Sequence, residues 1–389
     1  MNIEPTKVPM KGGGFAVVRK AAQGDAETLR RIYDAVYEGR YTLTIICDPE
    51  ESRVALDRED IHWLVAEVED RVVGSVVFSV DEGLKLAKVF GAVVLPEFRG
   101  SGLTEAAMRL GIAELVDGRG LAHSVYGTAR TVSPAPRKLL KNLGFKDIGI
   151  FPNVRKVDNY ETHCMSAYFR KGALESRVVP PRLPSCMKPF FSIVRRATGI
   201  GDAEWHDTRL EPSSPYAGGW IDFELVCAPE FIRRRWKALK AERKLKMQFF
   251  PFHEPNLLLA AKDGSAEVYI HYCAADHHAA IIGGHESVPD LTHLLNSVVM
   301  ALDAHGARFL ELLTSAYHPE VIKKILDARF IPSAYYPGLR WSQGRGHDYI
   351  VFTKSFVALD FRSIAAEGVF RDYLREYFSL WKTMYIEGA

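Results

Sequence analysis

Residues 91–107 read GAVVLPEFRGSGLTEAA, and the fold can be argued outward from this stretch. An apolar run and a proline lead into a bend that carries Gly100 and Gly102, and a helical pattern follows. Because glycine lacks a Cβ, the bend can aim several backbone N–H groups at one point. The helix adds its unpaired first-turn donors and its positive dipole end. Strand, bend and helix in this order predict a phosphate-binding turn.

Two glycines at a turn are also common without any ligand, but the neighbouring residues make this pattern more specific. Val94-Leu95-Pro96 precedes Arg99-Gly100-Ser101-Gly102-Leu103-Thr104, which resembles motif A of the GCN5-related N-acetyltransferase (GNAT) superfamily. In that family the loop holds the pyrophosphate of coenzyme A, and the strand before it pairs with the pantetheine arm. Thr104 stands where glycine or alanine is usual, so its side chain points away from the pyrophosphate or donates its hydroxyl. The resemblance implies a cofactor site made of Val94, Leu95, Arg99, Gly100, Ser101, Gly102, Leu103 and Thr104.

The order of the expected elements also resembles this family. Apolar periodicity and turn residues predict strands at 15–20, 63–68, 72–80, 88–95, 123–128, 148–151 and 164–169, with helices at 26–37, 49–58, from 103 and at 133–142. This is the GNAT order, and we place the domain at residues 15–172. The fold class that it implies is α/β, with a mixed, largely antiparallel sheet flanked by helices.

A second local match lies near the end of this domain. Many family members carry Asn-x-x-Ala-x-x-Leu-Tyr-x-x-x-Gly-Phe, and this chain has Ser133, Pro136, Leu139, Leu140, Gly144 and Phe145 at those positions. Ser133 can still bond the cofactor arm, so it joins the implied cofactor site. Leu140 replaces the tyrosine that often serves as general acid, so the usual acid is missing.

The catalytic residues are left unknown by the sequence. The strand at 88–95 has no carboxylate, and we cannot choose a base among nearby Glu67, Glu69, Asp81 and Glu82. Tyr126 is a possible acid, although a tyrosine in the core is the more common case.

Composition sets outer limits on function. A chain of 389 residues is longer than a domain with one hydrophobic core usually is. Its 47% hydrophobic and 25% charged residues are typical of globular proteins. The 50 basic and 48 acidic residues leave a net charge of +2, which argues against nucleic acid as partner. With no apolar run near the ~20 residues of a membrane span and no signal-peptide core, we expect a cytoplasmic protein without a membrane partner. The scattered cysteines and the adjacent His277 and His278 do not predict a metal site.

A second, weaker signal is internal repetition. A shift of 185 residues places Pro134 on Pro319 and Phe145 on Phe330. We therefore expect two tandem GNAT-like folds, divided into a flexible N-terminus (1–14), the coenzyme-binding domain (15–172), a Pro-rich linker (173–204) and a degenerate second copy (205–389). The same shift puts Glu286 into the second phosphate cradle, where its carboxylate would oppose coenzyme A.

By resemblance, the reaction is transfer of an acetyl or other short acyl group from coenzyme A to an amine of a small molecule or a protein. Acetyl-CoA is the implied cosubstrate, and no metal is implied. We expect a monomer with pseudo-dimeric halves or a homodimer. Two alternatives stay open: a non-catalytic coenzyme A or acyl-CoA binder, and a Fem-like transferase that takes amino acids from aminoacyl-tRNA.

Overall fold

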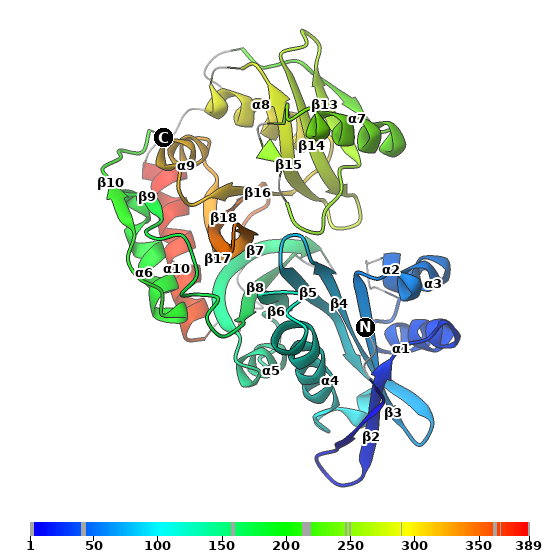
Figure 1. Cartoon of the computed structure of the whole chain (residues 1–389). Coiled ribbons are helices and arrows are strands. Elements are labelled where there is room, and N and C mark those ends of the chain that lie inside the picture. Colours follow the sequence, from blue (N-terminus) through cyan, green and yellow to red (C-terminus); the bar gives the residue numbers. More distant parts are fainter. Residues whose placement is uncertain are drawn as a thin grey trace.

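The computed structural model describes residues 4–39, 44–156, 160–211, 219–245, 247–248, 250–288, 290–360, 364–365 and 367–387. In this part of the chain one long sheet runs through the molecule, with helices on its faces (Figure 1). Its strand order is β1-β2-β3-β4-β5-β6-β8-β7-β17-β18-β16-β15-β14-β13-β11. β5 lies parallel to β6 and β15 parallel to β16, and the other neighbours are antiparallel. The expected α/β class with a largely antiparallel sheet flanked by helices is confirmed.

The first half contains the elements that the sequence predicts, with ends that differ by a few residues, together with two that the sequence did not predict, the strand Thr6–Pro9 and the helix Thr44–Cys47. They are β1 (Thr6–Pro9), β2 (Phe15–Lys20), α1 (Ala26–Tyr37), α2 (Thr44–Cys47), α3 (Pro49–Asp57), β3 (Ile61–Val68), β4 (Arg71–Asp81), β5 (Leu86–Val94), α4 (Leu103–Ile112), β6 (Ser124–Arg130), α5 (Ala135–Asn142), β7 (Lys146–Lys156) and β8 (Tyr160–Phe169).

The second half repeats this order with changes near its beginning. Its elements are β9 (Arg182–Pro184), α6 (Lys188–Thr198), β10 (Glu204–His206), β11 (Phe223–Val226), α7 (Pro229–Ala241), β12 (Met247–Gln248), β13 (Leu257–Ala261), β14 (Ala266–Cys273), β15 (His278–Glu286), α8 (Leu291–Ala304), β16 (Phe309–Ser315), α9 (Pro319–Asp327), β17 (Ile331–Ser342), β18 (Arg345–Ser355) and α10 (Val369–Lys382). The strands β13-β14-β15-β16-β18-β17 pair in the same sequence as β3-β4-β5-β6-β8-β7.

The two halves join where β7 meets β17. Gly149 lies against Ala334, and a Cβ on Gly149 would come within 2.3 Å of the Ala334 Cβ. A side chain at this position would force the strands apart, so glycine permits the sheet to continue from one half into the other. On one face of the junction, Ile150 of β7 shares a buried cluster with α6, α10 and the second half.

The segment at 173–204 is not the extended linker that its prolines predict. Residues 188–198 form α6, whose Phe190, Phe191 and Val194 are almost fully buried. Pro189 stands in the first turn of this helix, where a missing N–H breaks no helical hydrogen bond. The expectation of an irregular segment is therefore wrong for α6, which helps to bind the halves together.

The prediction of a flexible lead-in at residues 1–14 is also wrong for its described part. β1 pairs with β2 in a hairpin whose turn uses Gly12, Gly13 and Gly14, all with positive φ. Three glycines in a row suggest flexibility, but here they supply the left-handed conformations that the turn requires.

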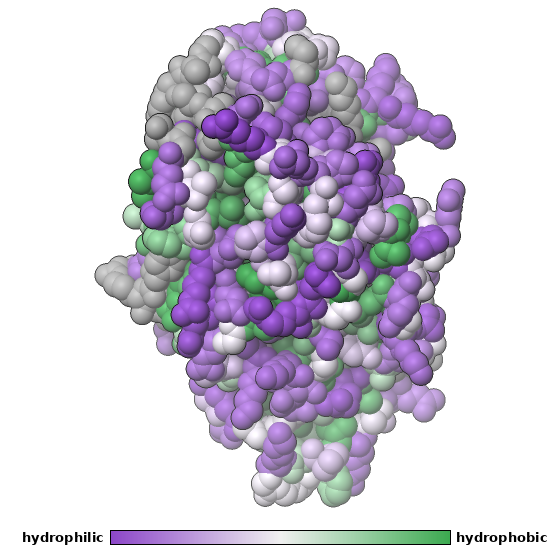
Figure 2. Space-filling view, turned by 90° about the vertical axis from the view of Figure 1, so that its left-hand side faces the viewer, coloured by the Kyte–Doolittle hydropathy of each residue, from purple (hydrophilic) through white to green (hydrophobic). Residues whose placement is uncertain are grey.

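The face of α6 and α10 is mainly hydrophilic, with hydrophobic residues in small separate groups (Figure 2). This agrees with helices that bury one side: Phe370, Tyr373 and Tyr377 of α10 lie in the core. Among the described residues, no helix combines the length and apolarity needed to cross a membrane.

Candidate functional site

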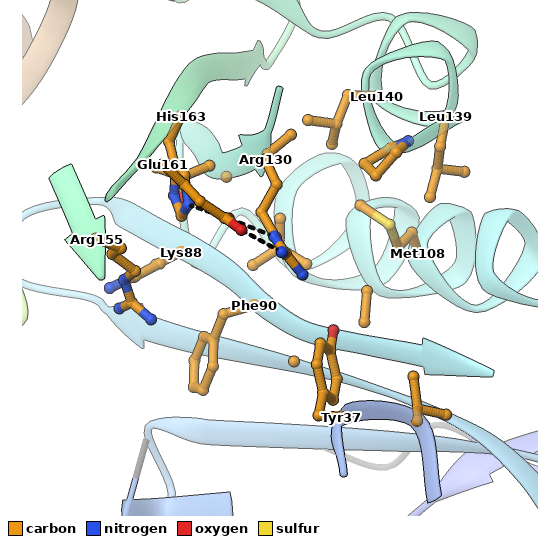
Figure 3. Close-up of a pocket in the computed structure, with 18 of the residues that line it drawn as sticks. Tyr37, Lys88, Phe90, Met108, Arg130, Leu139, Leu140, Arg155, Glu161 and His163 are labelled. Carbon is orange, nitrogen blue, oxygen red and sulfur yellow. Dashed lines mark hydrogen bonds and ion pairs between the residues drawn. The ribbon is translucent and has the colours of Figure 1, made fainter. Parts of the chain in front are cut away.

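A cleft opens where the parallel pair β5 and β6 separates. The two strands pair only between residues 86–88 and 124–126 and then diverge. The resulting cavity has a volume of about 530 Å³ and lies between β5, β6, α1, α5 and the ends of β7 and β8 (Figure 3). Apolar Met108, Leu139 and Leu140 lie at one end, and charged side chains gather at the other. We refer to this cavity as the cleft.

A β-bulge shapes the β5 wall of the cleft. Opposite β4, Gly91 and Ala92 are inserted between the paired residues Phe90 and Val93. Gly91 has φ 60°, and a Cβ here would lie 2.8 Å from the Tyr33 hydroxyl, which donates a hydrogen bond to the Gly91 carbonyl. Only glycine suits this position, and the bulge turns the strand so that Ala92 faces the cleft.

Beyond the bulge, the two expected backbone contacts differ. The Leu95 N–H donates to the Val73 carbonyl at 2.9 Å, so it is already used inside the sheet. Successive N–H groups of a strand point to opposite edges, so the Val94 N–H faces the open split. Of these two residues, Val94 is therefore the one whose backbone N–H can bond an amide group of a ligand.

The glycine loop, residues 99–104, lies at the N-terminus of α4. Gly100 and Gly102 have φ values of 82° and 83°, and a Cβ on Gly100 would meet nothing within 4 Å. Gly102 occupies the N-cap position without a side-chain cap, so the first N–H groups of α4 stay open. The Ser101 hydroxyl donates to the Phe98 carbonyl at 2.6 Å and holds the turn. Leu103 is buried. This arrangement suits an anion such as a pyrophosphate.

Lys11 joins this loop, and the sequence did not indicate it. Its backbone N–H donates to the Ser101 carbonyl at 2.8 Å, and its side chain lies beside Gly102. The ammonium is 3.9 Å from Glu105 and largely exposed. With exposed Arg99, it adds positive charge around the loop. Lys11 was missed because residues 1–14 were interpreted as a flexible lead-in.

The charged end of the cleft is built from β6 and β8. The Arg130 guanidinium forms two hydrogen bonds with Glu161 (Figure 3). His163 follows two residues later on the same face of β8, and its Nε2 lies 4.0 Å from a Glu161 oxygen without a hydrogen-bond partner in the described structure. Burial, with smaller effects of Arg155 and Arg130, lowers the pKa of His163 to about 3. His163 is therefore neutral at pH 7.

The second half contributes to the same end of the cleft. Asp276, in the turn between β14 and β15, is buried, and its Oδ2 lies 3.7 Å from Nε of Arg155 on β7. Lys88 of β5 lines the cleft beside Arg155 (Figure 3). Burial first, and Arg155 second, lower the pKa of Lys88 to about 8. Most Lys88 side chains are thus charged at neutral pH.

The acid and base candidates from the sequence lie elsewhere. Tyr126 is buried between the rings of Phe252 and Tyr336, so it has the structural role of a tyrosine in the core. The four carboxylates considered from the sequence are not among the residues that line the cleft: Glu67, Glu69, Asp81 and Glu82. Glu67 is paired with Arg19.

Leu140 of α5 lines the cleft, whereas Ser133 lies just before this helix and is not among the lining residues. Leu140 is buried and lines the cleft where the family often has tyrosine. The Ser133 hydroxyl accepts a hydrogen bond from Ala135 N at 3.3 Å, three residues before the lining residue Pro136. Glu161 and His163 escaped notice because the last strand was predicted to begin at Cys164. The available signal was the two-residue spacing of Glu161 and His163 in the stretch ETHC, which places both side chains on the same face of a strand.

The corresponding split in the second half is filled. β12 pairs with β15 at residues 283 and 284, along the edge where β15 leaves β16. The N-terminus of α8 is capped by Asp290, whose carboxylate accepts from Thr292 N at 3.0 Å. The prediction that Glu286 fills the cradle is wrong, because Glu286 is the last residue of β15 and pairs with Ala266. Only residues 287–290 connect strand and helix there, against 95–102 in the first half. The 185-residue shift therefore does not hold at this loop.

Sequence and structure comparisons give the following matches. Residues 27–145 match the model of the acetyltransferase (GNAT) family. No curated protein matches the chain. Similar solved structures include ribosomal-protein-S5-alanine acetyltransferase from Vibrio fischeri, at 16% identity over 42% of this chain and 97% of that chain, with TM-score 0.36. RimJ from Mycobacterium smegmatis, in complex with CoA-disulfide, has 19% identity over 43% and 87%, with TM-score 0.37. Ribosomal-protein-alanine N-acetyltransferase from Brucella melitensis has 20% identity over 39% and 98%, with TM-score 0.35.

Among the described residues, no group of three or more histidine, cysteine, aspartate or glutamate side chains is placed to hold a metal ion.

Proposed function

Residues 27–145 form a domain of the GNAT acetyltransferase family, and on that premise we propose that this protein transfers an acetyl or other short acyl group from coenzyme A to an amine. One observation carries the proposal. The cleft follows the β5 edge from the charged side chains around Lys88 as far as the bulge at Gly91 and Ala92, and the glycine loop stands beyond the end of the same strand. Such a cleft offers a place for an anionic cosubstrate and for a polar acceptor.

The residues present fit coenzyme A. The open N–H groups of the glycine loop, with Arg99 and Lys11 nearby, would hold its pyrophosphate. The Val94 N–H would bond the pantetheine arm, and Met108 and Leu139 would contact its apolar parts. Ser101 and Thr104 would contribute through their backbone, and Ser133 through its hydroxyl. When bound in its acylated form, coenzyme A supplies the thioester from which the acyl group is transferred.

Glu161 is the group that we propose to take the proton from the attacking amine, with the neutral His163 beside it. Attack requires a neutral amine, and a carboxylate beside a neutral imidazole can accept its proton directly or through water. Both side chains lie within the cleft (Figure 3). The bulge at Gly91 places backbone N–H groups of β5 next to the same space, where they can stabilise developing negative charge on the carbonyl oxygen.

Tyr37 is our candidate for the acid that Leu140 cannot supply. It lines the cleft from the end of α1, with its hydroxyl directed inward (Figure 3). Burial raises its pKa, so the hydroxyl carries a proton at neutral pH that it can give to the departing sulfur. The N–C bond forms as the C–S bond breaks, and one proton passes from the amine to Glu161 while another passes from Tyr37 to sulfur.

The division into two tandem folds belongs to the same proposal. The repeated strand order supports it, and the filled split between β15 and β16 supports a single coenzyme site per chain.

A non-catalytic coenzyme A binder is the second candidate, favoured by the leucine at position 140. Turnover of acetyl-CoA with any amine would exclude it.

Calorimetric titration with coenzyme A tests the proposal. We expect one site per chain in the wild type and a loss of affinity of roughly 100-fold or more in Gly102→Asp, whose carboxylate would occupy the N–H groups and repel the pyrophosphate. Gly264→Asp is the matched control, because Gly264 has a similar φ of 75° in the turn between β13 and β14 with nothing within 4 Å. Absence of binding to the wild type would refute the proposal.

A further inference from the structure

The charged end of the cleft holds more cations than it neutralises. Lys88, Arg130 and Arg155 line it together with the carboxylates Glu161 and Asp276. Arg130 is bound to Glu161, and Arg155 lies near Asp276. Among the described residues that line this end, the three cations outnumber the two carboxylates by one, and His163 is neutral.

Lys88 is the cation without a counterpart. It makes no hydrogen bond or ion pair with the described part of the chain, and its ammonium lies 5.9 Å from the centre of the Phe90 ring. The Glu311 carboxylate of the second half acts on Lys88 only through space, where it opposes the lowering of the Lys88 pKa. A partly buried ammonium that lacks a partner is costly, and it suits a site that an anion completes.

Asp276 of the second half lies next to Arg155 at this site. The 3.7 Å separation between Nε of Arg155 and Oδ2 of Asp276 is longer than a hydrogen bond, and Asp276 Oδ1 is buried without a hydrogen-bond partner. A ligand that carries both charges would satisfy the set. Its anion would bind Lys88, and its amine would face Glu161 and His163.

Taking acyl transfer from coenzyme A as the reaction, we propose that the acceptor is a small molecule with an amine and a carboxylate, that is, a free amino acid. Lys88 is the residue that selects the carboxylate, and Asp276 is the contribution of the second half to acceptor binding. The N-terminus of a protein fits less well, because its peptide bond replaces the carboxylate and leaves Lys88 unpaired.

A substrate panel tests this inference. The twenty standard amino acids, β-alanine and 4-aminobutyrate are each assayed beside their carboxamides with acetyl-CoA, and release of the free thiol is followed. We expect at least one amino acid to exceed its carboxamide roughly tenfold or more in kcat/KM, because the carboxylate gains charge-assisted hydrogen bonds. Lys88→Gln should reduce that ratio to near one by raising KM for the acid. Lys146→Gln, at an exposed lysine of β7, should leave the ratio unchanged.

Two results would overturn the inference while the proposed function stands. One is coenzyme A binding that Gly102→Asp abolishes, with no amino acid preferred over its carboxamide. The other is an equal loss of rate on acid and carboxamide in Lys88→Gln, which would mean that Lys88 does not recognise the carboxylate. Failure of the wild type to bind coenzyme A at all would overturn both proposals.

Discussion

The two halves of the sheet share a strand order but differ at the point where their parallel strands separate. Between β5 and β6 the split is open, and the helix that follows begins at uncapped Gly102. Between β15 and β16 the edge is taken by β12, and Asp290 caps the next helix. The second half therefore satisfies with its own backbone and side chain the groups that the first half leaves for a ligand. The shared strand order gives each half a position where a site can form, but a ligand can bind only where hydrogen-bonding groups are left unsatisfied.

Buried charges show the same difference. Asp348 in the second half accepts hydrogen bonds from Arg177, from the Tyr335 hydroxyl at 2.6 Å and from Gly338 N at 2.8 Å. In the first half, Glu161 binds Arg130, yet the neighbouring His163 Nε2 has no partner among the described residues. Buried polar groups are normally satisfied, and at the charged end of the cleft both His163 Nε2 and Asp276 Oδ1 are exceptions, which agrees with placing the chemistry there.

The largest effect should come from exchanging a carboxylate for its amide in each half. Asp348→Asn leaves Arg177 charged with its side chain only 3% exposed, and we expect the free energy of unfolding to fall by about 3–5 kcal/mol. Glu161→Gln is the matched change in the first half. It should cost about 1 kcal/mol or less, because the Arg130 side chain is 42% exposed and can be hydrated.

Urea unfolding of both variants measures this contrast. Stability of Asp348→Asn within about 1 kcal/mol of the wild type would contradict the structural role assigned to Asp348. Equal losses in the two variants would remove the distinction between a satisfied network and an open site. Glu161→Gln should in addition slow acyl transfer, an effect that a structural role would not produce.

A smaller effect, on the pH dependence of the free energy of unfolding, distinguishes the two halves. The pKa of His163 is about 3 in the folded protein, below the value of about 6.5 expected when unfolded. Between these values the unfolded chain binds more protons, so the stabilisation is complete above pH 6.5 and is lost as pH falls toward 3. From pH 7 to pH 5 this group alone should lower the free energy of unfolding by about 2 kcal/mol.

His163→Gln should therefore lose about 2 kcal/mol less than the wild type between pH 7 and pH 5 in urea unfolding. His318→Gln, at an exposed position of the second half, is the control and should follow the wild type. An unchanged pH dependence in His163→Gln would show that this imidazole has nearly the same pKa in the folded and the unfolded protein, which would contradict the lowering that we attribute to its burial.

The sequence predicted the fold better than the site, for a physical reason. Periodicity and glycine turns are local, so most strands and the bend at Gly100 and Gly102 could be anticipated. The charged end of the cleft is assembled from distant segments: Lys88, Glu161 and Asp276 come from different strands and turns. Nothing local indicates that Asp276 of the second half reaches a cleft of the first, because the joining of β7 to β17 brings it there.

The smallest predicted effect concerns the cap of α8, one of the two features that close the split between β15 and β16. Asp290→Ala removes the cap of α8, whose carboxylate accepts from Thr292 N, and should lower the free energy of unfolding by about 1 kcal/mol. It should not create a second coenzyme A site, because β12 would still occupy the β15 edge. Calorimetry should thus still count one site per chain. Two sites in Asp290→Ala would mean that the cap alone closed the second split, and that the halves differ by one side chain rather than by a strand.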